Sequence, residues 1–163
     1  MSFEQDQAYH KTFIDLAIDL ASNNVRSNCG GPFGAVVVKD GNVIATGVNR
    51  VVVAHDPTAH AEIEAIRLAC RALASFQLEG CDIYSSCEPC PMCMGAIYWA
   101  RPRAVYYAAT QADATDAGFD DSFIYRDMAL VPEARKIKMV HMLHQGAGAS
   151  FELWRVANRK VLY

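Results

Sequence analysis

The chain has 163 residues, 52% of them hydrophobic, which is typical of one domain with one sizeable core. Its formal net charge of -3 argues against a dedicated binder of nucleic acid, because such proteins usually carry a basic patch. The start of the sequence lacks a signal-peptide pattern and no apolar run is long enough to span a bilayer, so we expect a cytoplasmic protein with one domain over residues 1–163.

The first half of the sequence predicts a helix, a β-hairpin and a second helix. Apolar side chains at helical spacing over residues 9–24 predict an amphipathic helix that packs on a sheet. Residues 33–38 and 43–48 are apolar runs separated by an Asp-Gly turn signal, and they predict the strands of the hairpin. The second helix is expected to begin close to His60, with Thr58 as its N-cap.

The second half predicts three further strands. Residues 82–85 form a strand that leads into a helix beginning near Cys90, and residues 104–108 form the next strand. A short helical stretch over residues 121–128 separates this strand from a last one near residues 138–143, and a crossover of this kind favours a parallel arrangement.

Residues 146–163 form a distinct C-terminal segment. A spacer of alternating glycine and alanine opens it, and Ser150 is the expected N-cap of the apolar helix that follows. A helix on such a flexible tether can dock on its own core or on that of a neighbouring subunit, and these residues alone favour neither.

Two short motifs supply three metal ligands and one additional carboxylate. His60 and Glu62 form the first motif, and Cys90 and Cys93 belong to the second, Pro89-Cys90-Pro91-Met92-Cys93. Zinc held by three protein ligands keeps a fourth position for water and lowers the pKa of that water to about 7. We therefore assign Zn²⁺ to His60, Cys90 and Cys93, and general acid–base catalysis to Glu62.

Both motifs are expected to lie where a helix begins. Pro89 and Pro91 fit a helix start, and Cys90 and Cys93, three residues apart, share one face of that helix. Helix N-termini also favour anions, including thiolates. Two helix starts that face one another would form a preorganised zinc pocket.

A closed structural zinc site is the alternative interpretation of these motifs. Cys87 precedes Cys90 by three residues and could complete a Cys3His set. That interpretation leaves Glu62 without a role, and Cys87 ends an apolar run in which a small buried thiol is common. The open, catalytic site is therefore favoured.

The two motifs together match the signature of the zinc-dependent nucleobase deaminases. The whole chain resembles the cytidine deaminase-like superfamily, and within it most closely the bacterial guanine deaminases. Besides the zinc motifs, the stretches that carry the resemblance are residues 31–35, 47–50, 86–93 and 118–121. The resemblance implies an α/β fold, a three-layer α/β/α sandwich around a five-stranded mixed sheet. It also implies a homodimer in which the C-terminal segment is exchanged between subunits.

The activity implied by the resemblance is hydrolysis of guanine to xanthine and ammonia, in purine catabolism. Asp121 matches a position that assists binding or proton transfer, although it could equally cap the following helix. The backbone N–H of Ala61 is expected to contact a substrate carbonyl, and Tyr163 to reach the partner's active site. Asn49 can donate to and accept from a base edge or serve as a turn residue, and Phe33 can stack on the base or belong to the core.

Three alternative functions remain open. The substrate could be another base or nucleoside, such as guanosine, isocytosine, cytosine or cytidine, because a few pocket contacts decide between them. A tRNA-editing adenosine deaminase should carry a basic track for phosphates, whereas this chain is acidic. A zinc module that only binds a partner would not need Glu62. We expect a small purine substrate, with neither a membrane nor nucleic acid as partner.

Overall fold

The computed structural model describes the backbone of residues 3–162 and the side chains from Gln7 to Leu162. The chain divides into two compact units between Ser122 and Phe123. The first unit contains the sheet, and the second contains the C-terminal elements. No helix in the described part of the chain is both long and apolar enough to cross a membrane.

A mixed sheet forms the centre of the first unit. Its strands are β1 (Gly34–Lys39), β2 (Asn42–Val48), β3 (Cys81–Cys87) and β4 (Ala104–Ala109), in the order β2-β1-β3-β4. The β1 strand pairs antiparallel with both β2 and β3, whereas β3 and β4 are parallel. The predicted hairpin is confirmed, and β3 and β4 lie where residues 82–85 and 104–108 were predicted to form strands. The parallel arrangement was predicted for residues 104–108 with residues 138–143, and this pairing is not found because residues 138–143 form no strand.

The prediction of a fifth strand is wrong, because the sheet in the described part of the chain has four strands. Residues 138–143 lie in the second unit and form no strand. An extended segment becomes a strand only when a neighbouring chain completes its backbone hydrogen bonds. Residues 138–143 have no such neighbour among the described residues, and β4 is an edge strand.

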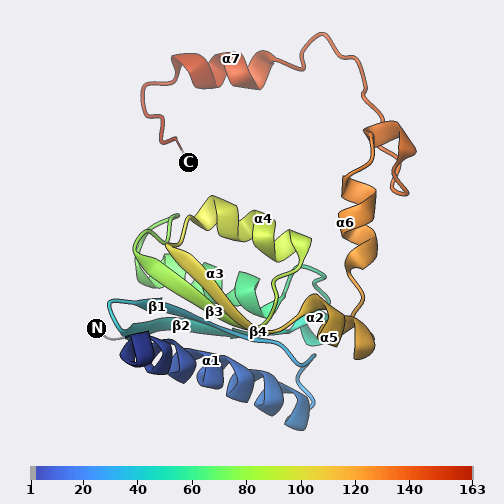
Figure 1. Cartoon of the computed structure of the whole chain (residues 1–163). Helices are drawn as coiled ribbons and strands as arrows, with labels where there is room; N and C mark the ends of the chain where they lie inside the picture. The colour runs from blue at the N-terminus through green and yellow to red at the C-terminus, as the bar shows by residue number, and fades with distance from the viewer. Residues whose placement is uncertain (1–2, 163) are drawn as a thin grey trace. The chain divides into compact units, whose positions relative to one another are not determined.

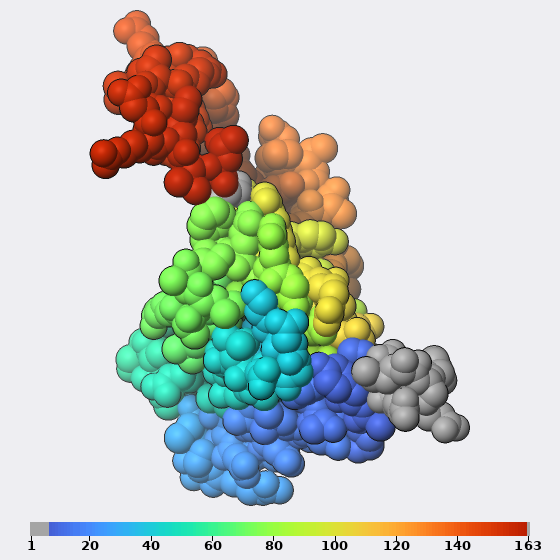
Figure 2. Space-filling view, turned by 90° about the vertical axis from the view of Figure 1, so that its left-hand side faces the viewer, coloured from blue at the N-terminus to red at the C-terminus, as the bar shows by residue number. Residues whose placement is uncertain are grey.

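Helices α1 (Phe3–Arg26), α3 (Ala61–Ala72) and α4 (Pro91–Ala100) cover the two faces of the sheet. Two short helices, α2 (Val51–Ala54) and α5 (Gln111–Asp116), follow β2 and β4 in the chain. The α1 helix lies on one face, and α3 and α4 lie on the other (Figure 1). In the space-filling view, the blue α1 runs along the bottom of this unit, below the cyan and green segments (Figure 2). The predicted three-layer arrangement is therefore present.

Two apolar layers hold the sheet and helices together. Alternate residues of β1 point to opposite faces, so this strand contributes to both layers. The layer between the sheet and α1 contains the buried side chains of Phe13, Ala17, Val36, Val38 and Tyr84. The layer between the sheet and helices α3 and α4 contains those of Ala35, Val37, Ala61, Ala65, Ala69, Ile83 and Ile97.

A glycine in β2 allows the strand to approach the start of α3 closely. A Cβ atom built on Gly47 would lie 2.1 Å from the carbonyl oxygen of Ala61 and 2.6 Å from the backbone nitrogen of Ala65. Only a residue without a side chain can occupy this position without moving the helix. Gly47 thus fixes the place of the helix that begins next to His60.

The second unit has little buried surface. It contains most of α6 (Ser122–Met128), the 3-10 helix η1 (Pro132–Ala134) and α7 (Ala149–Val156). The N-cap of α7 is Gly148 and not the predicted Ser150, because the spacer is itself turned: Ala149 N donates to Gly146 O at 3.1 Å. Large apolar side chains are exposed along this unit, at Ile137, Val140, Met142, Leu143, Phe151, Leu153, Val156, Val161 and Leu162.

Candidate active site

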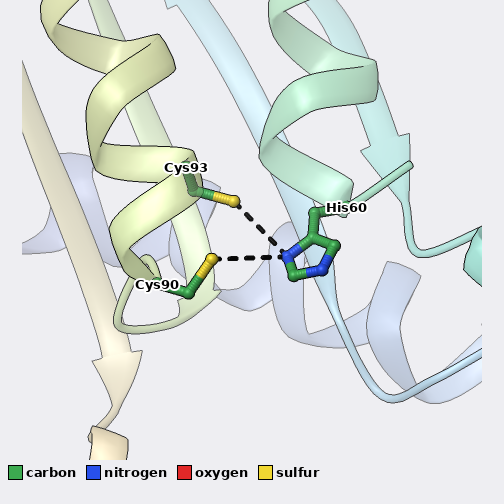
Figure 3. Close-up of side chains that lie close together, drawn as sticks. All are labelled: His60, Cys90 and Cys93. Carbon is green, nitrogen blue, oxygen red and sulfur yellow. Dashed lines mark hydrogen bonds between the residues drawn. The ribbon is translucent and has the colours of Figure 1, made fainter. Parts of the chain in front are cut away.

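The three predicted zinc ligands lie together. The Sγ atoms of Cys90 and Cys93 are each 3.5 Å from Nδ1 of His60, and the donor atoms all lie within 4.8 Å of one another. Figure 3 shows the three side chains pointing toward one another. Tetrahedral zinc with ordinary bond lengths to nitrogen and sulfur separates such ligands by about 3.6 Å. The donor set therefore fits zinc in both chemistry and spacing.

Both ligand motifs lie at helix starts, as predicted. His60 is the N-cap of α3 and Cys90 is the N-cap of α4, each with an extended backbone, and Pro91 occupies the first turn of α4. Neither N-cap side chain is used for capping, which leaves both for the metal. The predicted cap by Thr58 is wrong, because its hydroxyl donates to Asp56 Oδ1 at 2.7 Å in the preceding turn.

The electrostatics of the cluster suit a cation. Hydrogen bonding with Cys93 and His60 lowers the pKa of Cys90 to about 4. The hydrogen bond to Cys90 in turn raises the pKa of His60, and hydrogen bonding to Cys90 together with burial raises the pKa of Cys93. The cluster without metal thus holds protons around one thiolate, and a metal ion binds by displacing them.

Glu62 lies beside the ligands without being part of the cluster. Its side chain is buried, and burial raises the pKa of its carboxyl. Oε1 accepts a hydrogen bond from Ser85 Oγ at 3.1 Å, and Oε2 accepts one from Cys93 Sγ at 3.4 Å. A carboxyl held in this way can take up and release a proton next to the metal.

The closed structural site is disfavoured by the position of Cys87. This residue is not part of the metal-ligand cluster, and its thiol donates to the backbone oxygen of Thr110 at 3.6 Å. Burial raises the pKa of Cys87 to about 11, so it stays a thiol at neutral pH. His60, Cys90 and Cys93 thus remain as three protein ligands, the number that an open catalytic zinc site has.

A cavity of about 390 Å³ leads to the metal-ligand cluster. Its size is that of an ordinary small-molecule site. Six of the residues predicted for the site line it, namely Phe33, Asn49, His60, Glu62, Cys90 and Asp121. The other lining residues are Gly31, Val51, Val52, Cys87, Glu88, Gln111, Ala114 and Phe119.

The predicted substrate contacts occupy different parts of this region. Asn49 Oδ1 accepts a hydrogen bond from the backbone nitrogen of Val51 at 3.3 Å, so its Nδ2 group is the part available to a ligand. The Phe33 ring meets Phe119 edge to face, with centroids 5.0 Å apart. Ala61 is fully buried in the first turn of α3. The predicted contact of Tyr163 lies outside the described residues.

Asp121 lines the cavity and does not close the turn before α6. Its Oδ1 accepts a hydrogen bond from Gln111 Nε2 at 2.6 Å. The backbone nitrogen of Ser122 donates to Asp120 Oδ1 at 2.8 Å. Asp120, and not Asp121, therefore accepts the hydrogen bond from the start of α6 that a cap would accept. The geometry thus supports a role for Asp121 toward the cavity.

No role was assigned from the sequence to Ser85, nor to the lining residues Gly31, Val51, Val52, Glu88, Gln111, Ala114 and Phe119. Gln111 follows β4 closely, and Ser85 and Glu88 lie at the corresponding end of its parallel neighbour β3. Because the carboxyl ends of parallel strands meet at one edge of a sheet, their position after the predicted strands could have indicated them. Phe119 carried no signal beyond its place in the stretch 118–121.

Comparison with known proteins defines the class of this site. Residues 7–109 match the cytidine and deoxycytidylate deaminase zinc-binding region. The chain therefore belongs to this family of zinc-dependent deaminases, and zinc is its metal.

Individual relatives differ in how much of the chain they match. Guanine deaminase from Bacillus subtilis is 53% identical over 152 residues, which is 93% of this chain and 97% of that protein. The X-ray structure of guanine deaminase from Bacillus subtilis superimposes with a TM-score of 0.91, and the alignment includes 93% of this chain and 98% of the chain in that structure. A tRNA-specific adenosine deaminase from Agrobacterium fabrum is 54% identical over 78 residues, 48% of this chain and 51% of that protein.

Proposed function

We propose that this protein hydrolyses guanine to xanthine and ammonia. The extent of the likeness carries the proposal: 53% identity to a guanine deaminase extends over 93% of the chain, whereas the match to the tRNA-specific enzyme covers 48%. The residues beyond the shared zinc region thus follow the guanine deaminase. The natural context of this reaction is purine catabolism.

The chain's own residues account for the proton transfers. Zinc held by His60, Cys90 and Cys93 would lower the pKa of a bound water to about 7 and so make hydroxide available at neutral pH. Glu62 takes up one proton from the attacking water and delivers it to the ring nitrogen next to the reacting carbon. It then takes up the second proton, from the hydroxyl that has added to that carbon, and delivers it to the amine, which leaves as ammonia. Its raised pKa brings it closer to the working pH, where an acid–base catalyst is most effective. Ser85 holds Oε1 of this carboxyl and leaves Oε2 toward the metal ligands.

The cavity offers complementary groups for guanine. The Asn49 Nδ2 group is a donor for a carbonyl oxygen, and the Asp121 carboxylate is an acceptor for an N–H group. The contact by the backbone N–H of Ala61 stays a prediction, because Ala61 is fully buried and is not among the residues that line the cavity. The paired rings of Phe33 and Phe119 provide an apolar wall for the face of the base. A purine that carries both a carbonyl and N–H groups matches this set.

We further propose that the protein is a homodimer whose subunits exchange the C-terminal segment 146–163. The many exposed apolar side chains of the second unit support this, because such surface is ordinarily covered by a partner. The exposed edge of β4 offers hydrogen bonds that a segment such as residues 138–143 of a second copy could complete. In this arrangement, the partner's Tyr163 contributes to the substrate site.

All six cysteines are free thiols. We also propose that the protein is cytoplasmic, and the free thiols support this because reducing compartments keep thiols unpaired.

Ammonia release tests the proposed reaction. The zinc-loaded protein is assayed in parallel against guanine, guanosine, adenine, cytosine and cytidine, with Glu62→Ala as the control. Release from guanine alone supports the assignment, and release from another compound keeps the chemistry but changes the substrate. A protein inactive on all five that converts adenosine to inosine in tRNA would instead be the editing enzyme.

A further inference from the structure

We propose that Gln111 is a positioning residue that holds the Asp121 carboxylate at a fixed place relative to the zinc ligands. The inference rests on the proposed function, because Asp121 is the group assigned there to an N–H of the base. Gln111 Nε2 donates to Asp121 Oδ1 at 2.6 Å, and both side chains line the cavity that also contains His60 and Glu62.

Gln111 is itself anchored to the segment that carries the zinc ligand Cys90. Its backbone nitrogen donates to Glu88 Oε2 at 3.1 Å, and the backbone nitrogen of Glu88 donates to Ala109 O at 2.9 Å. One residue earlier, the Cys87 thiol donates to Thr110 O at 3.6 Å. These bonds join the segment that leads to Cys90 to the start of α5, so a displacement of either segment must move the other.

The start of α5 is closed locally as well. The Thr110 hydroxyl accepts from the backbone nitrogen of Asp113 at 3.3 Å, and Asp113 Oδ2 accepts from the backbone nitrogen of Thr110 at 2.7 Å. This reciprocal capping stabilises α5 as a helix. The backbone at Gln111 itself is held by Glu88, through the two bonds described above, and the amide extends toward Asp121 from there.

The amide leaves one Asp121 oxygen for the substrate. Gln111 engages Oδ1, whereas Oδ2 makes no hydrogen bond with the rest of the described chain. A carboxylate with one oxygen held and the other available presents a single direction for an N–H donor. Gln111 thereby determines where the N–H group of a bound base must lie to reach Asp121. That position in turn places the reacting carbon of the base beside the zinc ligands.

A double-mutant cycle tests this role in the full-length, zinc-loaded protein. Gln111→Met keeps the side-chain length but removes the donor, and we expect kcat/KM for guanine to fall by about tenfold to a hundredfold. In an Asp121→Ala background, the same change should alter kcat/KM by less than about twofold, because its target is gone. Equal losses in both backgrounds, or no loss in either, would overturn the proposal.

Asp113→Ala is the matched control for a purely structural effect. It weakens the same helix start without touching the amide, so the melting temperature should fall while KM for guanine changes by less than about twofold. If Asp113→Ala raises KM as much as Gln111→Met does, Gln111 acts only through helix stability. Both variants should bind zinc like the wild-type protein.

Crystal structures give a readout that does not depend on the substrate. In zinc-loaded Gln111→Met, the Asp121 carboxylate should rotate or move away while His60, Cys90 and Cys93 stay in place. An unmoved carboxylate would refute the positioning role. If the wild-type protein turns over another base instead of guanine, the proposed substrate fails, and the cycle is measured on that base.

Discussion

Glu62 is the side chain on which the proposed chemistry depends most. It is buried, it lies next to the metal ligands, and it is the acid–base group that the cluster does not use. Glu62→Gln keeps the shape but cannot exchange a proton, so kcat should fall by about 10²–10⁴ while the zinc content stays at one ion per chain. Steady-state kinetics and metal analysis check this, and full activity with bound zinc would contradict the mechanism.

Ser85 should act through Glu62. Its hydroxyl donates to Oε1 at 3.1 Å in a buried setting. Ser85→Ala leaves a buried carboxylate oxygen without its partner, which typically costs about 1–3 kcal/mol. We expect kcat to fall by about tenfold with KM for guanine unchanged, since Ser85 is not in the set that lines the cavity.

Ser86 is the matched control for that experiment. Its hydroxyl accepts a hydrogen bond from the backbone nitrogen of Gly34 at 3.0 Å, whereas the bond to Glu62 comes from Ser85. Ser86→Ala should therefore lower the melting temperature and leave kcat nearly unchanged. Equal kcat losses in the two variants would mean that the strand, and not the bond to Glu62, is responsible.

At the scale of elements, the junction of β2 with α3 should control the metal site. A Cβ on Gly47 would meet the Ala61 carbonyl oxygen at 2.1 Å, a backbone atom that cannot give way alone. Gly47→Ala should therefore shift α3, weaken zinc binding and destabilise the fold by about 1–3 kcal/mol. Thermal unfolding and zinc titration measure both effects.

Gly95, in α4, offers the control for that substitution. A Cβ there meets nothing within 4 Å, so Gly95→Ala should keep zinc affinity and leave stability equal or slightly higher. A variant Gly47→Ala that behaves like Gly95→Ala would show that the close approach does not constrain the site.

Local patterns predicted the elements that carry the site. Short apolar runs marked β1 and β3, and apolar residues at helical spacing after Thr58 marked the start of α3. The prolines and the spacing of Cys90 and Cys93 marked the start of α4. The zinc ligands were predictable for the same reason, since His60, Cys90 and Cys93 lie in two short motifs.

Features that depend on distant partners were not predictable. The strand ends place Ser85 and Gln111 at the edge of the sheet that carries the site, but their hydrogen bonds reach side chains 23 and 10 residues away, and no local spacing encodes those bonds. Thr58 has the chemistry of an N-cap, but an earlier aspartate, Asp56, competes for its hydroxyl. Residues 138–143 have the composition of a strand but lack a neighbour in the described chain.

For the whole molecule, removal of zinc should abolish activity while much of the fold remains. The metal-binding helix starts rest on an extensive apolar layer that needs no ion. We expect a chelator to eliminate guanine turnover, zinc to restore it, and circular dichroism to keep the helix signal, with a lower melting temperature because bound metal stabilises the native state. Complete unfolding on chelation would instead indicate a structural site.

Mixing two inactive chains tests the exchanged dimer. One chain carries Glu62→Ala, and the other lacks residues 161–163. If the tails are exchanged, a hybrid dimer contains one site with both Glu62 and an intact tail, so random mixing after joint refolding should restore about a quarter of wild-type activity. Each chain refolded alone is the control, and a mixture without activity would show that each tail serves its own subunit.

The exposed apolar surface of the second unit has a consequence for how the protein is made in a cell. Val156, Leu143 and Leu162 are more than three-quarters exposed, so a newly synthesised chain that has not met a second copy presents the kind of surface that chaperones and proteases recognise. If the protein forms the proposed exchanged dimer, pairing of two chains competes with degradation, and pairing wins only when copies are frequent. Cellular abundance should therefore rise more steeply than the rate of synthesis, with chains from one polysome favoured as partners.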